Sequence, residues 1–206
     1  MGLPVGVPVA LVPGVLALLP EYASIEDPVA ELRAAALSAV GGLGPRVLVV
    51  ASEATGGSGR RVGEALVAAV GAAVVAGAGA GSCAPDPAMP GSQAHDPAQG
   101  ATGVLVIGNG SATRTEKAPG HLDERAESFD DAVRAALASL DFTGVDASLA
   151  AELWADVEAM RVLPEVVSGP GEICYRDAPF GVAYCVARWA AGDGADRSLT
   201  ERPADG

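Results

Sequence analysis

The stretch "VLVIGNGSATRTEKAPGHLDERAESFDDAVRAALASL", residues 104–140, passes from an apolar run through a polar loop into an amphipathic helix. The run at 104–107 is continuously apolar, which is typical of a strand that is covered on both faces. Apolar residues then recur at helical spacing: Phe129, Val133, Leu137 and Leu140. Ser128 is predicted to cap this helix, with Asp131 near the capping-box position. The stretch therefore predicts one strand–loop–helix unit of an α/β fold.

The same alternation of strand and helix occurs upstream of this unit. A buried strand is expected at residues 5–12, and Asp27-Pro28 is typical of the start of a helix that Gly41-Gly42 would end. A second buried strand is expected at 46–52, before a Gly-rich loop. The following helix carries one apolar face: Val62, Leu66, Ala69 and Val70. These units favour a largely parallel sheet.

Downstream of residue 140, three further features are expected. Asp146 can begin a helix whose inward residues are Leu149, Leu153, Val157 and Met160. The stretch "EICYRDAPFGVAYCVARW" then predicts a β-hairpin with its turn at 177–181. A turn centred between Pro179 and Phe180 pairs opposed residues as Tyr175 with Tyr184 and Cys174 with Cys185. Both faces of this hairpin are largely apolar, so we expect it in the interior.

Composition and charge limit the classes of function. The chain has 206 residues, a formal net charge of -13 and a pI of about 4.4, so nucleic acid is an unfavourable partner. The first twenty residues are uncharged, but they lack a basic region and contain prolines that oppose a membrane span. Three cysteines form neither a disulfide framework nor a zinc motif. We expect a cytoplasmic protein without a membrane partner.

The chain is predicted to form a single domain over residues 1–190. Within it, residues 71–100 are rich in Gly, Ala and Pro and are expected to be a flexible insertion, with a weak strand at 72–78. Residues 191–206 are expected to be a polar tail.

The polar loop at 109–125 is the main candidate for a binding site. Asn109 and Ser111 offer hydrogen bonds at the carboxyl end of a strand, and Arg114 and Lys117 could hold a carboxylate or phosphate. His121 can exchange a proton near neutral pH. The alternative is a solvated loop held by two weak charge pairs, Glu116–Lys117 and Asp123–Arg125. Glu53, which follows the strand at 46–52, is a general base, a lone metal ligand or an exposed loop carboxylate.

Three segments together resemble the B-type family of class III extradiol ring-cleavage dioxygenases, in a branch common in actinobacteria. They are "LVPGVLALLPEY" at 11–22, "VIGNGSATRTEKAPGHLDERAESFDDAV" at 106–133 and "YRDAPFGVAYCVA" at 175–187. The resemblance implies a Rossmann-like α/β fold. The order of elements predicts the same class, with a mixed, mostly parallel sheet flanked by helices and closing in a C-terminal β-hairpin. The resemblance places the site at the carboxyl ends of the strands, where active members hold Fe(II) with two histidines and a carboxylate and use a further histidine as acid or base.

This sequence departs from the family at all three histidine positions. Gly14 and Glu53 stand where the two ligand histidines are expected, and Ala112 stands where the acid–base histidine is expected. His121 falls where the family has Tyr, and His95 lies in the insertion. We therefore predict a divergent family member with no metal and no cofactor.

Its predicted partner is a small anionic or aromatic metabolite, bound at the strand ends. The residues predicted to bind it are Gly14, Asn109, Ser111, Arg114, Lys117, Phe180 and Tyr184. Metal-independent acid–base catalysis would use His121, Glu53 or Glu116. Two alternatives stay open: an Fe(II) ring-cleaving dioxygenase with relocated ligands, and a non-catalytic partner or scaffold protein. Homo-oligomerisation also stays open.

Overall fold

The computed structural model of the chain describes residues 3–22, 27–53, 56–75 and 100–192. Its centre is a six-stranded sheet in the order β3-β2-β4-β1-β6-β5. The strands are β1 (Val9–Val12), β2 (Arg46–Val50), β3 (Ala73–Val75), β4 (Gly103–Ile107), β5 (Glu172–Asp177) and β6 (Tyr184–Trp189). The first four strands are mutually parallel, whereas β6 runs antiparallel to both β1 and β5. The predicted α/β class with a mixed, mostly parallel sheet is confirmed.

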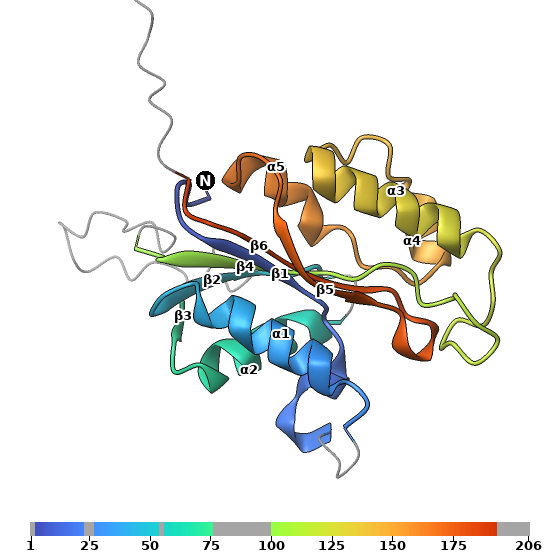
Figure 1. Cartoon of the computed structure of the whole chain (residues 1–206), viewed down its shortest axis with the longest axis horizontal. Coiled ribbons are helices and arrows are strands. Elements are labelled where there is room, and N and C mark those ends of the chain that lie inside the picture. The colour runs from blue at the N-terminus through green and yellow to red at the C-terminus, as the bar shows by residue number, and fades with distance from the viewer. Residues whose placement is uncertain (1–2, 23–26, 54–55, 76–99, 193–206) are drawn as a thin grey trace, which may run out of the picture.

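Helices cover both faces of this sheet (Figure 1). One face carries α1 (Ala30–Gly41) and α2 (Ser58–Ala69). The other carries α3 (Ala126–Ser139), α4 (Ala147–Glu152) and α5 (Leu163–Val166). Short 3-10 turns connect them: η1 (Leu16–Leu18), η2 (Pro20–Tyr22), η3 (Ala159–Val162) and η4 (Pro179–Gly181). Among the helices of the described residues, none is both long and apolar enough to cross a membrane.

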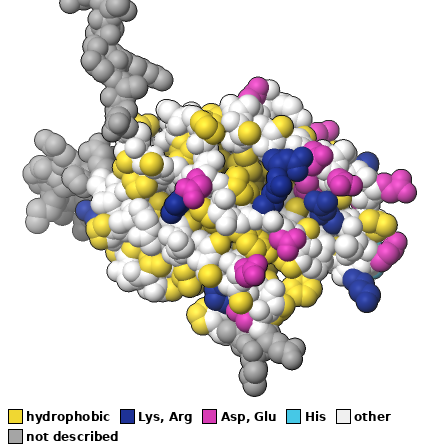
Figure 2. Space-filling view, in the orientation of Figure 1, with side chains coloured by type: hydrophobic (Ala, Val, Ile, Leu, Met, Phe, Trp, Pro, Cys, Tyr) yellow, Lys and Arg dark blue, Asp and Glu magenta, His cyan; other side chains and the backbone are white. Residues whose placement is uncertain are grey.

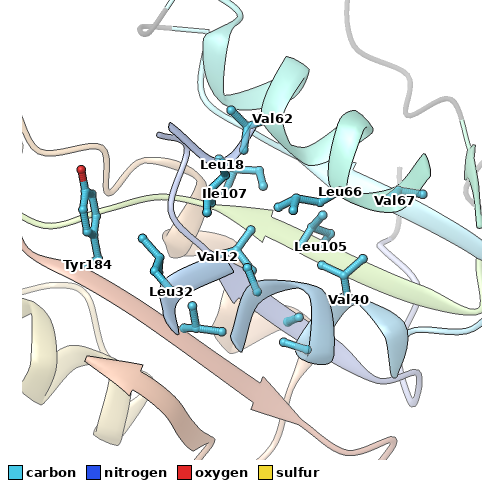
Figure 3. Close-up of a cluster of buried hydrophobic side chains, with 14 of the residues drawn as sticks. Val12, Leu18, Leu32, Val40, Val62, Leu66, Val67, Leu105, Ile107 and Tyr184 are labelled. Carbon is cyan, nitrogen blue, oxygen red and sulfur yellow. The ribbon is translucent and has the colours of Figure 1, made fainter. Parts of the chain in front are cut away.

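Two hydrophobic clusters separate the sheet from its helical layers. The cluster under α1 and α2 combines side chains of both helices with those of β1 and β4, and Tyr184 stands at one end of it (Figure 3). The second cluster packs α3, η3 and α5 against the opposite face of β1 and β4. Because β1 and β4 are buried on both faces, their apolar residues do not alternate with polar ones, as expected of parallel strands between helices.

Three predicted boundaries move in the structure. Strand β1 begins at Val9 and not at residue 5, because Pro8 has no amide hydrogen and the chain before it is exposed. Helix α3 begins at Ala126, so Ser128 lies inside its first turn and donates its hydroxyl to the Arg125 carbonyl instead of capping the helix. Asp146 does cap α4, by accepting from two backbone amides, but α4 ends at Glu152.

The predicted register and position of the hairpin are wrong. Arg176 lies opposite Cys185, and Asp177 lies opposite Tyr184, because the turn is longer than expected and includes η4. Phe180 and Gly181 both adopt positive φ, at 58° and 73°, which centres the turn one residue later than predicted. Strand β5 lies at an edge of the sheet, so the hairpin is not interior.

The two free cysteines of the hairpin lie on opposite faces of the sheet. A register shift falls between residues 173 and 175, at Cys174. Cys174 packs with the cluster under α1 and α2, whereas Cys185 packs with the cluster under α3. The predicted cross-strand pairing of these two thiols is therefore wrong.

The predicted insertion begins with regular structure. Residues 73–75 form β3, which pairs with β2 and confirms the weak strand expected at 72–78. Residues 76–99 of the predicted insertion, including His95, and the tail from residue 193 onward lie outside the described residues.

Candidate functional site

The polar loop after β4 is held between two parts of the fold by backbone hydrogen bonds. The Ala112 amide donates to the Leu153 carbonyl over 2.9 Å, which joins the loop to the end of α4. The Arg114 amide donates to the Gly181 carbonyl over 3.0 Å, which joins the loop to the hairpin turn. A further pair of bonds runs between residues 110–111 and Ala183. The first part of the loop is therefore bonded to the segment before β6 and to the end of α4 instead of standing free in solvent.

Asp130 on α3 fixes the loop from the other side. Its carboxylate accepts the Ser111 amide and the Ser111 hydroxyl, each over 2.7 Å. A Cβ at Gly110 would lie 2.6 Å from the Asp130 Oδ1, so only glycine allows this approach. Burial raises the pKa of Asp130, against the lowering effect of the two Ser111 bonds and of the Arg114 charge. The Ser111 hydroxyl, predicted to bind substrate, is thus fully buried and committed to Asp130.

A cavity of about 510 Å³ opens beside this Ser111–Asp130 pair. It lies between α3 and the α3-facing side of β5 and β6, where the space-filling view shows a hollow with hydrophobic walls and with Lys and Arg side chains beside it (Figure 2). Its apolar lining includes Val133, Leu137, Met160, Ile173 and Trp189. This volume is within the range of small-molecule sites, which are mostly apolar with a few polar groups.

Three arginines line the same cavity: Arg114, Arg134 and Arg176. Their concentration at one hollow contrasts with the formal net charge of -13. The Cys185 thiol also lines it, and burial raises the pKa of this thiol to about 11, so it is neutral at pH 7. The cavity therefore combines apolar walls, a neutral thiol, three guanidinium groups and the carboxyl residues Asp130 and Asp177.

The structure brings only some of the predicted binding residues to this cavity. Arg114 lines it, and Tyr184 borders it, although the Tyr184 ring packs in the cluster on the opposite face of the sheet. Burial also raises the pKa of Tyr184 to about 12, so the phenol stays neutral. Asn109 is tied to Asp156 by two backbone bonds, and Phe180 is 58% exposed at the tip of the hairpin turn.

The residues predicted for acid–base catalysis lie elsewhere. Glu116 and His121 are exposed on the polar loop, as is Lys117, which was predicted to bind the ligand, and none of them lines the cavity. Glu53 is exposed after β2, also outside the cavity lining. Of the two charge pairs expected in the loop, the Asp123–Arg125 pair is present, with 2.7 Å between Oδ2 and the guanidinium.

The three positions where the resemblance places histidines do not fit an iron site. A Cβ at Gly14 would lie 2.9 Å from the Ile107 Cγ2 and 3.1 Å from the Gly59 Cα, so the packing of α2 excludes a side chain there. Ala112 is buried and offers no ligand atom, which leaves the Glu53 carboxylate as the only donor of the three. Within the described residues, no group of three His, Cys, Asp or Glu side chains is placed to hold a metal ion.

Asp156 is a titratable residue that the sequence did not single out. Asp156 lies two residues after the exposed Trp154, and its backbone pairs with that of Asn109 at the carboxyl end of β4. Asp156 is only 7% exposed. Burial, with a smaller contribution from the Glu158 charge, raises the pKa of Asp156 to about 6. Glu158 in turn accepts the Ser52 hydroxyl over 2.7 Å at the end of β2. Asp156 is not among the inward residues of the helix predicted from Asp146, so the apolar periodicity gave no signal of this burial.

We predict that Asp156→Asn stabilises the protein at neutral pH and not in acid. The folded state binds the Asp156 proton more tightly than the unfolded chain, so the free energy of unfolding falls as pH rises from about 4 to 6. A rise in pKa from 3.8 to about 6 corresponds to about 2–3 kcal/mol. Urea unfolding at pH 4 and pH 8 measures the difference. Asp131→Asn, on the exposed side of α3, is the control, and an equal gain at both pH values would contradict the prediction.

Comparison with known proteins adds no family assignment. No protein-family model matches this chain, and no curated protein matches it at a significant level.

Proposed function

We propose that this chain is a divergent protein of the extradiol dioxygenase fold that binds a small anionic or aromatic metabolite without iron. We place the binding site in the cavity between α3 and the β5–β6 pair, beside the strand ends and not directly on them. The observation that carries the proposal is this cavity, with its apolar walls and its three arginines in an acidic chain.

The shape and lining of the cavity support a ligand with an apolar body. The side chains of Leu137, Met160 and Trp189 offer broad apolar surface, and burial of each CH₂ group of a ligand contributes about 0.8 kcal/mol. A ring or short chain of about ten heavy atoms would fill only part of 510 Å³, so the cavity can admit it without rearrangement.

Our proposal is one of binding and not of turnover. Glu53, Glu116 and His121 lie outside the cavity lining, so they are not placed to exchange a proton with a molecule bound there. Asp130 does line the cavity, but both of its oxygens already accept hydrogen bonds from Ser111. A catalytic role would therefore need a group other than those predicted.

The two tryptophans of the chain provide a direct test. Trp189 lines the cavity and is 5% exposed, whereas Trp154 is 61% exposed and lies outside the lining. In the Trp154→Phe variant, Trp189 is the only tryptophan left. We expect 3-phenylpropanoate to change Trp189 fluorescence saturably and to raise the Tm, because it binds the native state. The absence of any saturable response up to millimolar 3-phenylpropanoate and 3-phenylpropan-1-ol would overturn the proposal.

A matched pair of variants on α3 locates the site. Ala138 lines the cavity and Ala132 does not, and both are exposed on the same helix. In the Trp154→Phe background, Ala138→Phe is expected to block the cavity and abolish the fluorescence response, whereas Ala132→Phe is expected to retain it. Equal binding by both variants would place the ligand elsewhere.

A further inference from the structure

We propose that Arg176 is the residue that selects the charge of the ligand, and that the cavity takes apolar or aromatic molecules carrying a single carboxylate. This inference rests on the proposed function and adds to it the residue that recognises the charged group. Arg176 was not among the residues expected to bind substrate, because it sits in the hairpin and not in the polar loop.

The three arginines of the cavity differ in whether their charge is already paired. Arg114 lies 3.5 Å from the Asp130 carboxylate and 3.8 Å from that of Glu127. Arg134 lies 2.6 Å from the Asp131 carboxylate. Arg176 forms no ion pair and no side-chain hydrogen bond with any residue of the described ranges. It is therefore the cation at this cavity that is available to a ligand.

Asp177 also lines the cavity, but the strand geometry places its side chain and that of Arg176 on opposite faces of β5. Arg176 lies opposite Cys185, which faces α3, and Asp177 lies opposite Tyr184, whose ring packs under α1 and α2. Neighbouring residues of a strand point to opposite faces of the sheet. The Asp177 carboxylate also accepts the Ala178 amide over 2.7 Å. Asp177 therefore borders the cavity without forming an ion pair with Arg176, whose charge stays unpaired among the described residues.

The surrounding groups favour one negative charge and disfavour two. A guanidinium can bind a carboxylate through two parallel hydrogen bonds, which fixes its orientation. Asp130 lines the same cavity, and the chain as a whole carries a formal net charge of -13. A second negative charge on the ligand would find no free arginine and would be repelled by this field. The apolar walls would meanwhile contact the body of the ligand.

A different role for Arg176 is protection of the sheet edge. Charged residues on an edge strand oppose pairing with another chain, and β5 is such a strand. Edge protection does not depend on whether a ligand carries a carboxylate, so ligand selectivity distinguishes the two roles.

The test compares 3-phenylpropanoate with its neutral analogue 3-phenylpropan-1-ol, using Trp189 fluorescence in the Trp154→Phe background. We expect Arg176→Gln to weaken binding of the carboxylate at least about tenfold and to leave binding of the alcohol unchanged. Arg176→Lys should restore part of the affinity, since it keeps the charge but not the two-pronged geometry. Arg60→Gln, on α2 at the opposite face of the sheet, has the same net charge as Arg176→Gln and should bind the carboxylate as the wild type does.

The remaining outcomes separate this inference from the proposed function. Arg176 does not select the charge if both compounds bind Arg176→Gln as they bind the wild type. The same holds if Arg60→Gln loses as much affinity for the carboxylate as Arg176→Gln does. In either case the inference is overturned, while the cavity remains a binding site. If phenylsuccinate, which carries two carboxylates, binds more tightly than 3-phenylpropanoate, the single-charge selectivity is overturned. If neither of the first two compounds binds the wild-type cavity, the proposed function is overturned together with the inference.

Discussion

Replacing Asp130 with alanine is expected to lower the free energy of unfolding by about 3 kcal/mol. The carboxylate is the acceptor for both the Ser111 amide and the Ser111 hydroxyl, and the Ser111 residue is fully buried. Removal of the acceptor leaves two buried donors unpaired, and each such donor costs about 1–3 kcal/mol. Release of the burial penalty that raises the pKa of Asp130 offsets part of this loss. Urea unfolding monitored by circular dichroism measures the change.

The Ser111–Asp130 pair also fixes the loop that carries Arg114 at the cavity. Ser111→Ala, which removes only the hydroxyl donor, should cost about 1 kcal/mol. Asp131→Ala is the control, since Asp131 is the exposed neighbour on α3 and pairs only with Arg134 among the described residues. If Asp130→Ala is no less stable than Asp131→Ala, the pair does not hold the loop.

The second large effect is expected from Gly14→His, which introduces a histidine where the resemblance places one. A Cβ alone would approach the Ile107 Cγ2 to 2.9 Å and the Gly59 Cα to 3.1 Å, and an imidazole adds further atoms to the same contact. Overpacking of this kind costs about 1–3 kcal/mol, and the backbone of α2 cannot yield as a side chain can. We expect a loss of about 3 kcal/mol and no gain of Fe(II) binding. Denaturant unfolding and anaerobic metal titration measure the two results.

Gly144→His is the matched control for this substitution. No atom lies within 4 Å of a Cβ built at Gly144, so a histidine there should change the free energy of unfolding by less than about 0.5 kcal/mol. A stable Gly14→His variant that binds one equivalent of Fe(II) would show that α2 can move aside. The position would then be a vacated ligand site and not a packing contact.

Much of the fold could be predicted from local patterns. The apolar runs of β2 and β4 indicated two of the central strands to within two residues, and the Asp146 cap indicated the start of α4. These features depend on residues close together in the chain, namely hydrophobic periodicity and side-chain capping. The prediction of the hairpin register was wrong because the register depends on how many residues the turn contains, and η4 has no strong sequence signal.

The candidate site could be predicted only in part. The polar loop identified Arg114, which lines the cavity, but it also suggested Ser111 as a ligand contact when the hydroxyl is bound to Asp130. The spacing of Ser111 and Asp130 offered a signal, since a serine after a strand and an aspartate in the next helix can meet across a loop. Arg176 has no such sequence signal, because the elements around it are distant from it in the chain. Its lack of an ion pair is visible only in three dimensions.

The sequence by itself determined the order of strands and helices, the parallel core, and the absence of histidine at the three positions that the resemblance names. Those features follow from side-chain type and local spacing. Only the tertiary structure decided that α2 leaves no space for a side chain at Gly14, that Asp156 is buried, and that a cavity opens between α3 and β5. Each of these depends on contacts between segments far apart in the chain, whose geometry is set by the packing of whole elements and not by any local pattern.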